Sequence, residues 1–363
     1  MHNLQHLTGF RGLAALLVVF YHIQKYISPY VNESVNAFLS HGYLAVDFFF
    51  ILSGFVIGFN YFDRLIKLEK EAVFHFYIKR IARIYPLHLI VLLGYLSIPV
   101  AYLITGRGFS FSGQFSIEGF VSGLFLIQTW GWLEDITWNI PSWSISTEMM
   151  AYILFPAMVF SLNYIVKLFG EKGVVVSAFL SMALIIFIFR GLGEKDIGES
   201  IQALGAIRCV FEFLSGVCIW LIYHNYKNSL IKLATPLFLG GIFLFIVCTY
   251  LGVANYYFVP LSMVMVLTGS ISHQNIITHF FSTRVLIWLG NISYSVYLTH
   301  YLIRDWFKLL FLDSPSASLI WISSYVLTVI VVSHFLYKYF EMPAKNFVLH
   351  TFIQKEKGKK CSS

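Results

Sequence analysis

Ten apolar segments, each long enough to cross a lipid bilayer as a helix, determine what this chain can fold into. A transmembrane helix needs about 20 mainly apolar residues. Composition agrees, since 58% of the 363 residues are hydrophobic and 12% are charged, whereas a soluble domain is about a quarter charged. We expect an all-α integral membrane protein with about ten transmembrane helices in one bundle, at about residues 9–27, 43–61, 84–105, 143–161, 173–190, 201–223, 233–251, 255–271, 286–310 and 318–340.

The distribution of lysine and arginine predicts the orientation of these helices. If segment 119–132 does not cross and the N-terminus is cytoplasmic, most loop cations and the Lys-rich end 355–360 lie on one side. Cytoplasmic loops carry such an excess, which explains the net charge of +7 without nucleic acid. We expect cytoplasmic termini, an outer loop 106–142 with a re-entrant or interfacial helix, a membrane domain over 1–350 and a basic, disordered cytoplasmic tail over 351–363.

An arginine and a histidine interrupt the first apolar segment. A charged side chain at the centre of a membrane helix costs roughly 2.5–3.5 kcal/mol on insertion scales, which makes Arg11 a candidate functional residue. The N-terminus lacks a basic segment and a small-residue cleavage site, so this helix is expected to be retained. His22 follows Arg11 by eleven positions, which places both on one helix face about 16 Å apart.

A pair of arginines precedes the third apolar segment. Arg80 and Arg83 lie one helical turn apart, so both guanidinium groups can point the same way. Arg11 is expected at nearly the same depth, and planar guanidinium groups bind phosphate oxygens in pairs. The three arginines therefore indicate a site for a polyanion. The alternative is that Arg80 and Arg83 only flank a helix, as basic residues often do.

Two carboxylates are expected at the depth of His22. Glu148 begins a helix that enters from the outer side, and Asp47 begins another. A carboxylate beside an imidazole fixes its tautomer and raises its basicity, which suits a general base. The three residues are candidate catalytic groups. The alternative for each carboxylate is a structural hydrogen bond or ion pair between helices.

Further polar and aromatic residues are candidates for lining a cavity or binding an acceptor. Serine and tyrosine hydroxyls at helical spacing often join membrane helices, which is the first interpretation of the run from Ser293 to His300. Tryptophans around the outer loop suit a membrane interface or stacking on a sugar. Glu341 is expected to pair with a basic loop and Pro343 to end the last helix. We expect no metal site; the candidates for this lining are Trp143, Ser146, Tyr294 and His300.

Taken in this order, the motifs resemble the membrane-bound acyltransferase-3 family, whose bacterial members modify cell-surface polysaccharides. The resemblance covers nearly the whole chain and departs from the family pattern at Thr147, where valine is commoner. It implies ten spans in the bacterial inner membrane, a cytoplasmic acyl-CoA donor and functional roles for Arg11, His22, Arg80 and Arg83. With no esterase-like domain after the last span, activity is expected to be complete within the membrane unit. The motifs are Gly9-Phe10-Arg11-Gly12 with His22, Val46-Asp47-Phe48 to Phe55, Arg80-x-x-Arg83 before Tyr85-Pro86, Trp143-Ser144-Ile145-Ser146-x-Glu148, Ser293-Tyr294-Ser295 to His300, and Phe340-Glu341-x-Pro343.

The resemblance leads to a specific hypothesis of transmembrane O-acyl transfer. Acyl-CoA, as acetyl-CoA, would place its phosphates at the three arginines as a co-substrate, with no permanently bound cofactor. His22 would deprotonate a hydroxyl of an extracytoplasmic glycan such as O-antigen, capsule or exopolysaccharide, with Glu148 or Asp47 orienting the imidazole. Direct transfer and an acyl-enzyme both remain open, as do the acceptor, the acyl length and the oligomeric state. The competing class is a transporter or flippase of an anionic or lipid-linked saccharide.

Overall fold

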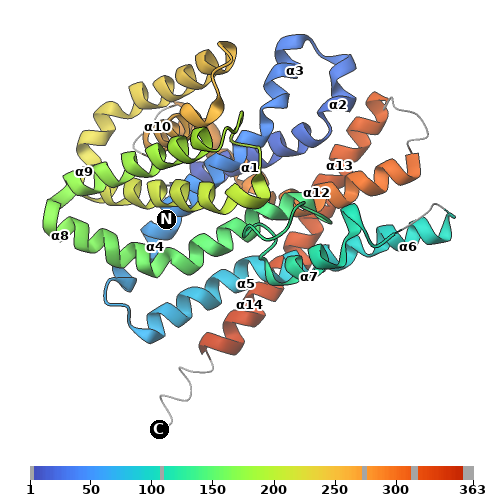
Figure 1. Ribbon diagram of the computed structural model, residues 1–363, viewed down its shortest axis with the longest axis horizontal. Coiled ribbons are helices and arrows are strands. Elements are labelled where there is room, and N and C mark those ends of the chain that lie inside the picture. The colour runs from blue at the N-terminus through green and yellow to red at the C-terminus, as the bar shows by residue number, and fades with distance from the viewer. Residues whose placement is uncertain (1–3, 107–109, 272–275, 312–317, 355–363) are drawn as a thin grey trace, which may run out of the picture.

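The expected all-α fold is confirmed. A computed structural model of the chain describes residues 4–106, 110–271, 276–311 and 318–354, and every regular element in these ranges is a helix (Figure 1). Most of the predicted tail 351–363 lies outside the described residues. The longer helices are α1 (Gln5–His22), α4 (Ala45–Leu65), α5 (Lys70–Tyr95), α8 (Trp143–Gly191), α9 (Ile201–Tyr250), α10 (Val259–Ile271), α12 (Arg284–Phe311) and α13 (Leu319–Leu336).

Shorter helices connect and extend these elements. The connections near the start of the chain are α2 and α3, and α6 and α7 follow α5. The chain after α13 continues through a π-helical turn into α14. The short α-helices are α2 (Gln24–Ile27), α3 (Glu33–Ser40), α6 (Ser97–Ile104), α7 (Ile117–Phe125), α11 (Ile276–Phe281) and α14 (Met342–Leu349).

All ten predicted segments fall on helices, although they are not ten separate helices. Backbone breaks at Gly170 and Tyr226 divide α8 and α9, so that each holds two predicted segments. Gly170 has φ +59°, a conformation that glycine adopts without steric cost, and Figure 1 shows α8 turning back on itself. Within the described residues, five helices are long and apolar enough to cross a membrane, or six if the bent pair α1 and α2 is one span. The count of ten crossings stays a prediction.

Several predicted helix ends are wrong. The first helix ends at His22, where the chain bends by 72° into the next short helix. The third helix begins at Lys70, so Arg80 and Arg83 lie inside it rather than at its start. Pro343 does not end the last helix, because it occupies the first turn of α14 directly after a π-helical turn, where its missing N–H costs no hydrogen bond.

The loop 106–142 contains the expected short helix. This helix, α7, has nine residues and packs against α5, where His88 Nε2 lies 2.8 Å from the carbonyl of Gly123 and Tyr85 donates to Leu124 O at 3.0 Å. Nine residues span only about 14 Å as a helix, which is less than half of a bilayer core. The segment is therefore too short to cross, as the loop charges required.

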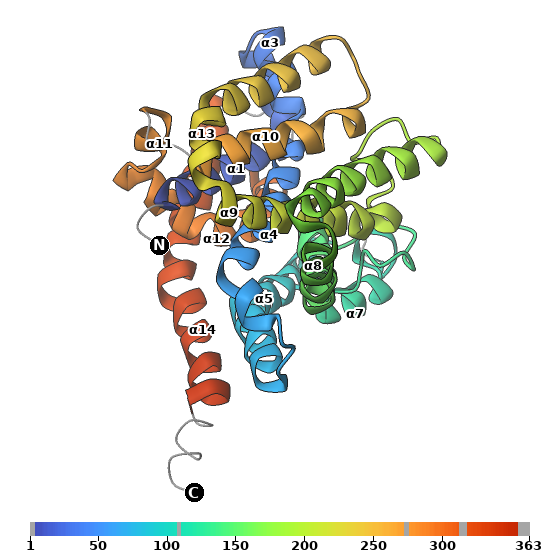
Figure 2. The same ribbon diagram turned by 90° about the vertical axis from the view of Figure 1, so that its left-hand side faces the viewer.

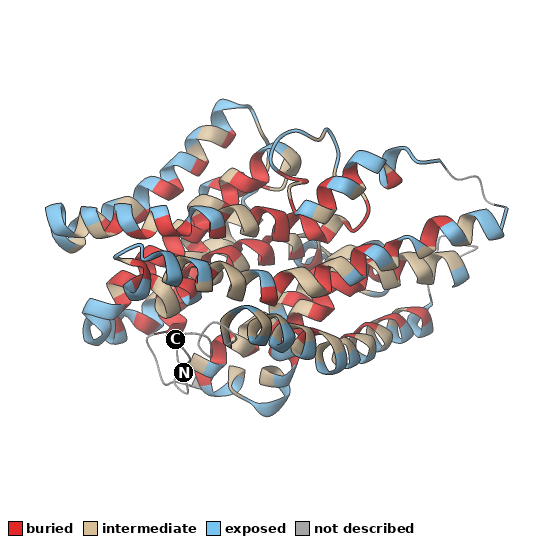
Figure 3. Cartoon of the chain, turned by 90° about the horizontal axis from the view of Figure 1, so that it is seen from below, coloured by how far each residue is buried: buried red, intermediate tan, exposed pale blue. Residues whose placement is uncertain are grey.

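Close packing of α1 against α12 positions the site. At Gly290 a Cβ atom would lie 1.8 Å from the carbonyl oxygen of Thr8, and at Gly12 it would lie 2.8 Å from the backbone nitrogen of Gly290. Only glycine permits this approach, as is common between membrane helices. Figure 2 shows α1 and α12 close to one another, and Figure 3 shows buried residues concentrated in the interior of the molecule.

Candidate functional site

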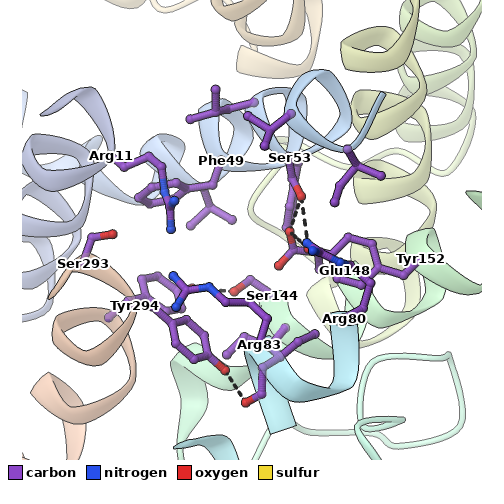
Figure 4. A pocket seen from close by; sticks show the side chains of 18 residues that line it. Arg11, Phe49, Ser53, Arg80, Arg83, Ser144, Glu148, Tyr152, Ser293 and Tyr294 are labelled. Carbon is purple, nitrogen blue, oxygen red and sulfur yellow. Dashed lines mark hydrogen bonds between the residues drawn. The ribbon is translucent and has the colours of Figure 1, made fainter. Parts of the chain in front are cut away.

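Three arginines from two helices meet in one cavity, which we call the arginine cavity. Arg11 comes from α1, and Arg80 and Arg83 come from successive turns of α5. Figure 4 shows the three side chains extending into the same space. The helices α4, α8 and α12 complete its wall with Phe49, Ser53, Ser144, Glu148, Tyr152, Ser293, Tyr294, Tyr297 and apolar residues. The expected convergence of the arginines is present in the structure.

The three guanidinium groups differ in how they are held. Arg83 pairs with Glu341, and Arg80 donates to the hydroxyl of Tyr61 at 3.2 Å. Within the described residues, Arg11 makes no hydrogen bond or ion pair, and the Nε of Arg80 has no partner. Buried donors are normally satisfied. The cavity therefore presents unused positive donors, as a site for phosphate or another anion requires.

Glu148 lies in the arginine cavity and does not orient His22. It accepts hydrogen bonds from Ser53 and from Tyr152, the latter at 2.6 Å (Figure 4). Together with Glu341 it offsets two of the three arginine charges, which leaves one positive charge uncompensated. The expected contact with His22 is absent among the described residues, because Ser53 of α4 and Tyr152 of α8 hold the Glu148 carboxylate in the arginine cavity. Glu148 instead belongs to the lining of the anion site.

His22 pairs with His300, a contact that the sequence interpretation did not foresee. His22 Nδ1 lies 2.9 Å from the carbonyl oxygen of Val18 and 3.2 Å from Nε2 of His300. His300 is completely buried, and its Nδ1 lies 3.2 Å from the carbonyl of Val296. Both histidines are therefore anchored to the preceding turn of their own helix.

These contacts determine where the protons lie. A carbonyl oxygen only accepts hydrogen bonds, so Nδ1 of each ring carries a proton. The one hydrogen on Nδ1 of His22 is then shared between Val18 O and Nε2 of neutral His300, as a bifurcated hydrogen bond, and the lone pair of His22 is left on its Nε2. This tautomer is assigned from the hydrogen-bond network. It makes His22 Nε2 available as a base, with His300 ready to support the imidazolium once a proton is taken.

One face of α12 connects the histidine pair to two cavities. Tyr294 and Tyr297 line the arginine cavity, and the ring of Tyr297 lies 6.1 Å from that of His300. On the other side, Tyr301 packs against His22 at 5.2 Å between ring centroids and lines a second cavity. We call this the Tyr301 cavity; it is also lined by Tyr102, Gln114, Phe115, Asp135, Arg304, Asp305 and Lys308. Along α12, the histidine pair therefore lies between the residues that line the arginine cavity and those that line the Tyr301 cavity.

Asp47 forms a structural ion pair instead of orienting His22. Its carboxylate accepts two hydrogen bonds from Arg208 of α9, at 2.8 and 2.6 Å, and both side chains are buried. Arg208 also donates to Ile197 O at 3.0 Å. Because both carboxylate oxygens are engaged by one guanidinium, the structure supports the alternative interpretation of Asp47 as a tie between helices.

Two other candidate residues line neither cavity. Trp143 is buried against Arg208 and Phe50, at 5.5 and 5.8 Å between the interacting groups. Ser146 donates to the carbonyl of Leu126 at 2.8 Å, and it also accepts from Thr129 at 2.9 Å. Both residues join α8 to neighbouring segments, so the expected role in acceptor binding has no geometric support. Tyr294 and His300 are placed at the site, in the lining and in the histidine pair.

The expected pairing of Glu341 with a basic segment is present, since it holds Arg83 and also accepts from Ser295 at 2.7 Å. The sequence analysis missed three groups that complete the site. Tyr301, Arg304 and Asp305 were not singled out. The signal was present, because Arg304 and Asp305 are charged residues inside an apolar segment, and Arg304 follows His300 by four positions, on the same helix face. Among the described residues, no three His, Cys, Asp or Glu side chains gather to hold a metal ion.

Comparison with known proteins gives consistent matches. The model of a family described as an acyltransferase domain matches residues 4–337. O-acetyltransferase OatA of Staphylococcus aureus is 21% identical over 97% of this chain, which covers 59% of OatA. Acyltransferase MdmB of Streptomyces mycarofaciens is 35% identical over 42% of this chain, which corresponds to 38% of MdmB. The chain thus spans less than two thirds of the length of these relatives, and no solved structure matches it significantly.

Proposed function

The chain belongs to the membrane-bound acyltransferase-3 family, and on that basis we propose that it is a transmembrane O-acyltransferase. It takes an acyl group, as acetyl, from acyl-CoA on the cytoplasmic side and transfers it to a glycan hydroxyl on the opposite side. The observation that carries this proposal is the position of the His22–His300 pair between two cavities, one of them rich in arginine.

The arginine cavity suits the phosphates of the donor. Unpaired donors on Arg11 and Arg80 and the uncompensated positive charge favour a polyanion. From Arg11 the unbroken helix α1 rises about 16 Å to His22. An extended pantetheine arm covers a comparable length, so the nucleotide end and the thioester end can reach these two residues together. Tyr297, which separates the cavity from His300, must then move aside for the thioester.

The histidine pair supplies the proton transfer. His22 Nε2 takes the proton of the acceptor hydroxyl while its oxygen attacks the thioester carbonyl, and His300 accepts the hydrogen bond of the resulting imidazolium. Collapse of the tetrahedral intermediate breaks the C–S bond, and the thiolate of CoA leaves with the proton from His22. General base catalysis of this kind contributes roughly 10²–10⁴-fold.

The chain is a multi-pass membrane protein, and we propose that it resides in the bacterial inner membrane. The Lys- and Arg-rich loops support cytoplasmic termini, and α5, which carries Arg80 and Arg83, begins at Lys70 directly after one such loop. This orientation opens the arginine cavity towards cytoplasmic acyl-CoA. The same orientation opens the Tyr301 cavity towards the opposite side of the membrane, where a saccharide or lipid-linked glycan can bind.

Transfer by purified protein tests the proposal. Protein reconstituted in liposomes is given acetyl-labelled acetyl-CoA and glycan extracted from a host strain that lacks the protein, and label in the glycan is counted. We expect transfer by the unaltered protein, none by His22→Ala, and a raised KM for acetyl-CoA with nearly unchanged kcat in Arg80→Ala. Full transfer by His22→Ala would refute the role of the base. Movement of glycan across the membrane without CoA release would identify a flippase instead.

A further inference from the structure

We infer that the Tyr301 cavity binds the acceptor as an uncharged sugar ring, with Arg304 and Asp305 holding its hydroxyls. This inference rests on the proposed function and extends it to a specific site. The cavity has a volume of about 500 Å³, within the range of roughly 300–1,000 Å³ typical of small-molecule sites.

The cavity adjoins the base through a single residue. Tyr301 lines the cavity and contacts the imidazole of His22 at 5.2 Å between ring centroids, edge to face. The guanidinium of Arg304 lies over the same ring, 3.4 Å from its centroid. A hydroxyl of a sugar lying beside Tyr301 is therefore one ring away from His22. The Tyr301 cavity shares no lining residue with the arginine cavity.

The polar groups in the cavity are arranged around Asp305. Its carboxylate accepts from Arg304 at 2.8 and 3.1 Å, and from Gln114 and Tyr95 at 3.5 Å. Lys308 Nζ lies 3.7 Å from it. The side chains of Arg304 and Asp305 are only 10% and 11% exposed, so their neighbours hold them in place. Both side chains nevertheless line the cavity. The remaining guanidinium hydrogens can donate and the carboxylate can accept, which matches the paired donors and acceptors of neighbouring hydroxyls.

The two cavities differ in net charge, and this difference indicates different classes of ligand. The positive charges of Arg304 and Lys308 are balanced by the negative charges of Asp305 and Asp135, whereas the arginine cavity keeps one positive charge. A balanced site gives little net attraction to a polyanion such as a nucleotide. Aromatic rings complete the lining through Tyr102, Phe115 and Tyr301; all three offer apolar faces, and the two tyrosines add a hydroxyl. This combination suits the alternating C–H faces and hydroxyl edges of a neutral sugar.

The rim of the cavity is open to water. Gln114 and Asp135 line it and are exposed, and both belong to the loop 106–142. The neighbouring residue Glu134 is also exposed but does not line the cavity. Glu134 is therefore a suitable control position for Asp135. The two residues are adjacent, acidic and exposed, but only Asp135 lines the cavity.

The first test separates binding of the acceptor from binding of the donor. Arg304→Lys and Asp305→Asn are assayed for transfer of acetyl label from acetyl-CoA to the extracted host glycan. We expect the KM for glycan to rise about 10–100-fold, the effect of a lost hydrogen bond to a charged group, while the KM for acetyl-CoA stays unchanged. An unchanged KM for glycan in both variants would overturn the inference.

The second test uses exposed positions, so that folding is not affected. Asp135→Cys and Glu134→Cys are made in a background with Cys248→Ser and Cys361→Ser, since Cys209 and Cys218 are buried, and are modified with a biotin maleimide. We expect modification at 135 to abolish transfer and modification at 134 to leave it intact, with acetyl-CoA binding equal in both. Full transfer after modification at 135 would contradict the inference. Failure of the unmodified wild-type protein to transfer label would instead refute the proposed function.

Discussion

His300 Nε2 lies 3.2 Å from Nδ1 of His22, joining α12 to α1 across 278 residues of sequence. The contact takes the place that a carboxylate was expected to fill. A neutral imidazole that can only accept at Nε2 orients His22 without adding a negative charge to the membrane interior, where an unpaired charge is costly.

Substitution of His300 tests this contact. His300→Ala removes one of the two acceptors of the His22 Nδ1 proton, so kcat should fall about 10–100-fold, corresponding to a lost hydrogen bond to an imidazolium, with both KM values unchanged. His300→Gln, whose carboxamide oxygen can accept the same proton, should retain more of the activity. Equal loss in the two variants at equal thermal stability would show that His300 acts only through packing.

Arg11 should contribute to donor binding through its unused donors. Arg11→Leu should weaken binding of CoA about 10–100-fold, because hydrogen bonds to charged groups contribute roughly 1.5–3 kcal/mol. Arg11→Lys should recover part of this loss, since an ammonium keeps the charge without the planar geometry. The measurement is the Kd for CoA by calorimetry in detergent. Arg64→Gln, an exposed position on α4, is the control, and a similar weakening there would indicate a general charge effect.

The Asp47–Arg208 pair should matter for stability rather than for catalysis. Removing one partner of a buried ion pair costs about 3–5 kcal/mol, so Asp47→Asn should lower the Tm in detergent markedly. The double variant Asp47→Leu with Arg208→Met should recover much of the stability, because it leaves no unpaired charge. An inactive Asp47→Asn protein with unchanged Tm would restore the catalytic role first expected for Asp47.

The close approach of α1 and α12 should be essential to the site. A Cβ atom at Gly290 would collide with the Thr8 carbonyl, so Gly290→Ala should push the helices apart. Because the histidine pair depends on this packing, acetyl transfer should be lost. The loss of transfer activity should be larger than any decrease in the amount of protein expressed. Gly191→Ala serves as the control because nothing lies within 4 Å of the added atom. Wild-type activity in Gly290→Ala would show that the crossing tolerates separation.

Helical periodicity was sufficient to predict half of the site. The 3.6-residue repeat placed Arg11 and His22 on one face of α1, and Arg80 one turn from Arg83, because these relations are local to one helix. The cost of burying arginine in lipid marked Arg11 as functional. The same reasoning predicted an all-α membrane fold, since the apolar segments leave few alternatives.

Relations between distant segments could not be predicted from the sequence alone. Arg208 lies 161 positions from Asp47, and Glu341 lies 258 positions from Arg83, so no local pattern pairs them. The partners of Glu148 were misjudged because they were inferred from depth along straight helices, whereas its carboxylate is held by Ser53, 95 positions away in the sequence. His300 was recognised as a candidate, but its partner depends on the Gly12–Gly290 crossing.

The sidedness of transfer tests the central claim most directly. Inverted membrane vesicles, which expose the cytoplasmic face, are supplied from outside with acetyl-labelled acetyl-CoA, and vesicles of the opposite orientation serve as the comparison. The account predicts labelled glycan on the luminal side of the inverted vesicles and none when intact right-side-out vesicles receive the same donor. Label appearing only where donor and acceptor share one side would contradict it.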